Sequence, residues 1–140
     1  MRDEDVVLEG AAANLIWRVL VTGHEQDLLT MLHVHRDGRP VDISGFGGPA
    51  LYPGALVNEW RGRADGLPYF VMARAHPSVE RLVAETEKGL MLDLDLSPVV
   101  PRYRLRFAAA ALPPGEAPGR LHLSIQDGTQ MHVLTPVSTR

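Results

Sequence analysis

The chain has 140 residues, of which 45% are hydrophobic and 22% are charged, and its formal net charge is -3 at pH 7. These values are typical of a globular protein with a core of its own, and they exclude the compositions of disordered and membrane-embedded chains. Because 14 basic residues face 17 acidic ones without a basic run, we expect no nucleic-acid partner and no membrane partner.

Cysteine is absent, which excludes disulfide frameworks, cysteine-type zinc sites and thiol nucleophiles. The acidic start M-R-D-E-D-V-V-L-E-G lacks the basic and apolar regions of a secretory signal, so we expect a cytoplasmic protein. We expect one β domain within 1–140, with 1–12 as a poorly ordered N-terminal segment. All basic residues except Lys88 are arginine, a bias typical of a high-G+C, actinobacterium-like genome.

Alternation of apolar and polar residues, interrupted by Asp-Gly pairs, predicts an all-β chain. In the first half, the predicted strands cover 14–22, 28–35, 40–44, 58–63 and 68–75. The second and third of them flank Asp37-Gly38, which is a strong cue for a hairpin.

The segment 78–88 is the stretch where a short helix competes with a strand. Its apolar residues have helical spacing, and Ser78 can cap a helix that Gly89 ends. A strand is favoured, because a turn at 87–89 would place it in a hairpin with the alternating strand 90–96.

Acidic and basic stripes follow one another along the chain. Asp93 and Asp95 share one side of strand 90–96, and the arginines of R-Y-R-L-R-F share one side of the predicted strand 102–107. The aspartates could act as paired carboxylates or bind calcium, but cross-strand ion pairs with these arginines are the favoured interpretation.

The last two predicted strands flank a third Asp-Gly pair. A three-residue loop ending at Thr129 unites their apolar residues on one face and sets His122 and His132 on a shared polar face. No acid is expected near them, so this face is interpreted as a hydrophilic surface. The proline-rich stretch 112–119 reads as a crossing between two sheets. The whole pattern predicts a two-sheet β-sandwich that resembles immunoglobulin-like domains, with a small barrel as the alternative.

Residues 44–54, S-G-F-G-G-P-A-L-Y-P-G, contain the G-x-G-x-x-A spacing of a dinucleotide-binding loop. Such a site needs a helix directly after the glycines, because the helix N-terminus holds the pyrophosphate. Pro49, Pro53 and Gly54 stand where that helix would begin. We therefore expect no cofactor, and interpret the loop as structural or partner-facing.

The stretch L-H-V-H places His33 and His35 on one face of a strand, as two ligands of one metal ion require. A regular hairpin sets His33 opposite Asp42, with Ser44 adjacent. This patch allows a metal site or a Ser-His-Asp cluster, but neither a third ligand nor a G-x-S-x-G elbow accompanies it. A solvated or interaction face is therefore favoured, and no metal is expected.

The sequence thus predicts an interaction or assembly module rather than an enzyme, and a homodimer is its simplest assembly because open sandwiches leave strand edges. The alternatives are a metal- or ligand-binding β-barrel enzyme that uses the histidines and Asp42, and a structural subunit of a larger complex. The expected ligand or interaction face consists of His33, His35, Asp42, Ser44, Gly45, Phe46, Gly47, Gly48, Tyr52 and Trp60.

Overall fold

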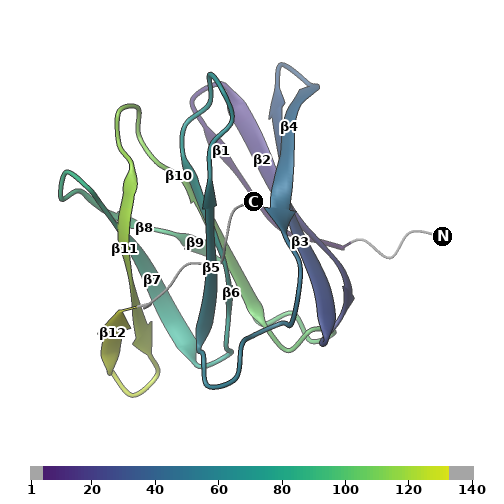
Figure 1. The fold of residues 1–140 in the computed structure, drawn as a ribbon, viewed down its shortest axis with the longest axis vertical. Coiled ribbons are helices and arrows are strands. Elements are labelled where there is room, and N and C mark those ends of the chain that lie inside the picture. The colour runs from purple at the N-terminus through teal and green to yellow at the C-terminus, as the bar shows by residue number, and fades with distance from the viewer. Residues whose placement is uncertain (1–4, 133–140) are drawn as a thin grey trace.

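The computed structural model describes residues 5–132, and it places them in twelve strands that form three antiparallel sheets without a helix (Figure 1). The first sheet is a meander of β1 (Asp5–Ala12), β2 (Leu15–His24), β3 (Asp27–Arg36) and β4 (Arg39–Phe46). The middle sheet contains, in spatial order, β5 (Val57–Gly62), β6 (Phe70–Ala75), β10 (Arg106–Ala111) and β9 (Asp95–Leu96). The third sheet contains β12 (Gln130–His132), β11 (Pro118–Ile125), β7 (Val79–Thr86) and β8 (Met91–Asp93).

The middle sheet lies between the other two, as Figure 1 shows with β1–β4 on the right and β7, β11 and β12 on the left. One apolar core joins the first sheet to the middle sheet, and a second core joins the middle sheet to the third. All six residues of β6 are buried, because both faces of this strand are covered. The predicted all-β sandwich is confirmed, and it has three sheets where the sequence pattern indicated two.

Alanines make this double coverage possible. The side chains of the middle sheet meet a neighbouring layer on both sides, and five buried alanines keep those layers close: Ala73, Ala75, Ala108, Ala109 and Ala110. Leu82, Leu121 and Leu123 of the third sheet complete the second core. In the second core, small side chains of the middle sheet are thus matched by large ones of the third sheet, which fills the interior at the density that protein cores require.

The strand predicted over 102–107 lies further along the chain than expected. Residues 101–104 form a turn in which Arg104 has a φ of 55°, and β10 begins only at Arg106. The predicted orientation of the side chains is confirmed, since Tyr103 is buried while Arg102 is exposed. The predicted ion pairs between the aspartates and these arginines also differ from the structure. Asp93 forms its ion pair with Arg81, at 2.6 Å, rather than with one of them.

The sequence pattern set residues 1–12 apart as an N-terminal segment, and the structure describes its residues from Asp5 onward. They form β1, and Val7 and Leu8 pack against the first core. The hydroxyl of Tyr103 donates a hydrogen bond of 2.8 Å to the Asp5 carboxylate, which ties the start of β1 to the 101–104 turn. Residues 1–4 and 133–140 lie outside the described part of the chain.

The remaining connections agree with the sequence pattern. The segment 78–88 is a strand, since β7 pairs with both β8 and β11. The proline-rich stretch 112–119 carries the chain from β10 in the middle sheet to β11 in the third, as predicted. Residues 91–96 also link these sheets, because β8 pairs with β7 and β9 pairs with β10.

Candidate functional site

The β3–β4 hairpin contains a bulge that reverses the predicted register. His35 pairs with Pro40 and Val34 pairs with Asp42, so that Val41 is an extra residue on β4. One extra residue moves every later side chain of the strand to the opposite face of the sheet. Pro40 was the available signal, because proline within a sheet is confined to edges and bulges.

The bulge separates the residues that were expected to form a His-Asp-Ser patch. Ile43, not Asp42, lies opposite His33. Asp42 and Ser44 lie instead on the inner side of the sheet, opposite the buried Val34 and Leu32. The expected arrangement, with His33 opposite Asp42 and Ser44 adjacent, is therefore wrong. Within residues 5–132, no group of three or more His, Asp or Glu side chains is arranged to hold a metal ion.

The outer face of the first sheet, which points away from the middle sheet, carries apolar and imidazole side chains. Its exposed apolar members are Val6 at 56%, Ile16 at 49%, Leu29 at 40% and Ile43 at 59% relative exposure. In one row across the strands, Ile16 lies opposite His35, and in the next row Arg18 and Ile43 flank His33. The ion pair between Arg18 and Glu9, at 2.7 Å, lies at the β1 side of this second row.

Residues 44–54, here called the glycine loop, have a structural role, because their backbone and that of β3 supply hydrogen-bond acceptors to the fully buried Arg74. The Arg74 guanidinium donates to the carbonyl oxygens of Leu28, Phe46 and Pro49 at 2.6, 3.1 and 2.7 Å, and to the Thr30 hydroxyl at 2.8 Å. It also lies 4.1 Å from the centroid of the Phe46 ring. Burial lowers the pKa of Arg74 to about 10.

The loop needs its glycines for the close approach of the backbone. A Cβ at Gly45 would lie 2.1 Å from the carbonyl oxygen of Thr30, and Gly48 has a φ of 113°, a conformation that other residues rarely adopt. Tyr52, at the end of the loop, is 46% exposed. Trp60 is 3% exposed and lies in the first core, so it is not at the surface with the other residues of the expected interaction face.

Glu59 precedes Trp60 on β5 and is buried as well. Burial raises its pKa, although Arg61 donates a hydrogen bond of 2.7 Å to its carboxylate. Arg61 also donates to the carbonyl oxygens of Pro118 and Gly119, which joins β5 to the start of β11. This pair therefore connects the middle and third sheets rather than facing solvent.

The histidines of the third sheet share a face, as predicted. The register between β11 and β12 differs by two residues from the one that a three-residue loop would give. His122 lies opposite His132, and their ring centroids are 4.6 Å apart. The expectation that no acid lies nearby is wrong, because Glu85 of β7 is 2.8 Å from the Nε2 atom of His122. The strand order places this acid beside the histidine, and strand order cannot be read from a local pattern.

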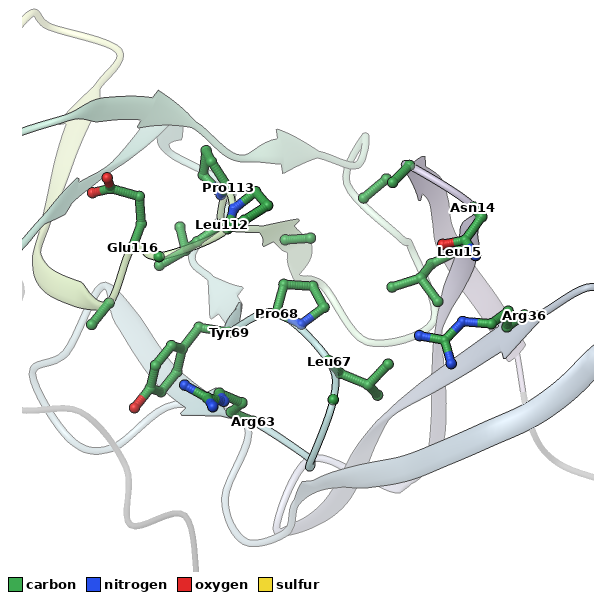
Figure 2. Close-up of a pocket in the computed structure, with 17 residues that line it drawn as sticks. Asn14, Leu15, Arg36, Arg63, Leu67, Pro68, Tyr69, Leu112, Pro113 and Glu116 are labelled. Carbon is green, nitrogen blue, oxygen red and sulfur yellow. The ribbon is translucent and has the colours of Figure 1, made fainter.

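A pocket at one end of the sandwich, here called the end pocket, was not found from the sequence. Figure 2 shows it between the β1–β2 turn, the β5–β6 loop and the β10–β11 crossing. Its volume is about 850 Å³. The apolar wall residues include Leu15, Leu67, Pro68, Tyr69, Leu112 and Pro113. The polar residues of its lining are Asn14, Arg36, Arg63 and Glu116. The sequence signal for it was two loops rich in proline and glycine, 65–68 and 112–119, whose convergence needs the fold.

Searches with protein-family models, among curated proteins and among solved structures found no match to this chain. Among the described residues there is no helix with the length and hydrophobicity that a membrane crossing requires.

Proposed function

We propose that the protein is an interaction module, and that two copies associate through the outer faces of their first sheets. The observation that supports this function is the group of Val6, Ile16, Leu29 and Ile43, which are 56%, 49%, 40% and 59% exposed on one face. Leu20 and Met31 stand in the row between Ile43 and Leu29 and make the group continuous. Scattered exposed apolar residues are ordinary, but a contiguous group on a regular sheet is typical of an interaction surface.

The charges of the outer face favour a second copy as the occupant. Glu9 and Arg18 neutralise each other at 2.7 Å, and the one other Asp, Glu, Lys or Arg on the outward positions of β2 and β3 is Asp27, at the end of the face beside the β2–β3 turn. The central parts of two such faces can therefore approach without a like-charge repulsion, and a strongly charged partner would find few complementary charges there.

Both edges of the first sheet carry features that oppose strand addition. The edge strand β4 carries Pro40, the bulge at Val41 and the inward-facing Asp42, and the other edge strand, β1, carries a bulge between Val6 and Leu8. Each of these features is a known protection against edge pairing. Association through the face, rather than extension of the sheet, is the arrangement that remains, and it repeats the sheet-on-sheet packing inside each copy.

The size of the face predicts a weak dimer. Four strands spaced by about 4.8 Å, with about eight residues of about 3.3 Å each, give a face of roughly 500 Å². Two copies would bury roughly 1,000 Å², which is at the lower limit for a specific interface. We therefore expect a dimer that dissociates on dilution within the micromolar range.

Sedimentation velocity over a range of protein concentrations tests this function. We expect Ile43→Asp to remain monomeric where the natural chain dimerises, because a carboxylate would be buried in the apolar interface. Met91→Asp is the matched control, since Met91 is 55% exposed on β8 of the third sheet. A natural chain that is monomeric at every concentration would contradict the proposal, and so would dissociation caused by Met91→Asp.

A further inference from the structure

We propose that the end pocket binds a small molecule that combines an apolar body with one anionic head group, either a carboxylate or a phosphate. This site is separate from the outer face of the first sheet, since it lies at the end of the sandwich where loops of all three sheets converge (Figure 2). Loops held by a rigid sandwich are a common place for binding sites.

The size and lining of the end pocket suit a small organic molecule. Its volume of about 850 Å³ lies within the range of roughly 300 to 1,000 Å³ that small-molecule sites occupy. Pro68 and Pro113 restrict the backbone of two walls, and the Leu112 N–H group donates to the Tyr69 carbonyl oxygen at 2.8 Å, which holds those walls together. A wall that is already ordered loses little entropy when a ligand binds.

Two arginines give the end pocket its preference for an anion. Figure 2 shows the guanidinium groups of Arg36 and Arg63 on different sides of the pocket, Arg36 on the side of Leu15 and Arg63 beside Tyr69. Arg63 stacks over the Tyr69 ring at 5.2 Å from its centroid, an arrangement that leaves the N–H groups at the edge of the guanidinium able to donate.

Within residues 5–132, neither Arg36 nor Arg63 forms an ion pair with an acidic side chain. Arg18, Arg61 and Arg81 each have such a partner. Arg36 is half-buried and Arg63 is exposed, so both guanidinium groups are accessible to a ligand in the end pocket.

Glu116 is the acidic residue of the lining, and in Figure 2 its carboxylate lies at the end of the pocket opposite Arg36. The net charge of the lining is therefore positive, and a guanidinium binds a carboxylate or a phosphate through two parallel hydrogen bonds. The apolar walls would receive the body of the ligand.

Three probes with the same decyl chain test the site: decanoate, decyl phosphate and decyltrimethylammonium, each below its micelle-forming concentration. They would be titrated into the uniformly ¹⁵N-labelled full chain and followed by amide chemical shifts. We expect the anions to shift residues 63–69 and 111–117 and to bind at least tenfold more tightly than the cation. The stronger anion would identify the head group.

Variants at the pocket separate specific binding from general attraction of charge. Arg36→Gln and Arg63→Gln should each weaken the binding of the favoured anion about tenfold or more. Tyr69→Leu should also weaken it, because it removes the ring that orients Arg63 while the charge is unchanged. Arg104→Gln, an exposed arginine of the 101–104 turn outside the lining, is the control and should have no effect.

Three results would overturn the proposal. The first is the absence of binding by any of the probes. The second is a set of shifts centred on the outer face of the first sheet rather than on the pocket loops. The third is an equal affinity for anion and cation, or an equal loss of affinity in Arg104→Gln and Arg63→Gln.

Discussion

Arg74 joins two layers of the sandwich without a carboxylate partner in the described part of the chain. It extends from β6 of the middle sheet to backbone oxygens of β3, β4 and the glycine loop, all of which lie in or next to the first sheet. Arg74→Met would keep the volume but leave these buried acceptors without a donor. We expect the free energy of unfolding to fall by about 3 to 5 kcal/mol, measured by urea denaturation.

Arg74→Lys distinguishes the shape of the guanidinium from its charge. Lysine carries the same charge, but its ammonium is a point donor and cannot reach several oxygens on different segments. We expect a loss close to that of Arg74→Met. A lysine variant as stable as the natural chain would show that charge alone is sufficient.

At the scale of the strands, the alternating pattern predicted most of the strands correctly, but it gave the wrong register for the β3–β4 hairpin. β2 and β3 were predicted because their inward residues alternate strictly, as Trp17, Val19 and Val21 show. The bulge at Val41 could not be predicted from alternation, because an unbroken hairpin also gives an apolar face. The register is decided by distant groups, since Phe46 at the end of β4 is held inward against Arg74.

The candidate sites were predicted less well than the strands, for the same reason. The outer face contains His33 and His35, as expected, but the bulge moved Ile43 beside them in place of the acid. The end pocket depends on loops that meet only when three sheets are stacked. β10 was predicted in the wrong place because a run of alanines has too little hydrophobic contrast to mark a strand.

The alanines of the middle strands should tolerate no enlargement. Ala109 is fully buried in the first core, between two sheets. Ala109→Leu would force neighbouring side chains out of their preferred rotamers, and we expect it to lower the free energy of unfolding by about 1 to 3 kcal/mol. Ala11→Leu on the exposed side of β1 is the control, and urea denaturation should show it within about 0.5 kcal/mol of the natural chain. Equal effects of the two changes would contradict the close packing described for the middle sheet.

At the scale of the whole molecule, the order of the layers predicts an order of local stability. β6 and β10 are hydrogen-bonded on both sides and covered on both faces, whereas β12 is a short, exposed edge strand. Native-state hydrogen exchange should therefore be slowest at the amides of β6 and β10, which open only when the molecule unfolds, and fastest at β12. Equal protection of β12 and β6 would be inconsistent with this layered stability.

The position of the middle sheet also determines how the chain can fold as it is synthesised. The first sheet is complete at Phe46, but the β10 strand that helps to cover its inner face ends at Ala111. At about 5 to 20 residues per second, the ribosome needs roughly 3 to 13 seconds to make the intervening chain. During that interval Trp17, Leu32 and their neighbours have no complete layer to pack against. The nascent first sheet is thus the stage of biosynthesis at which aggregation, or binding by a chaperone, is expected.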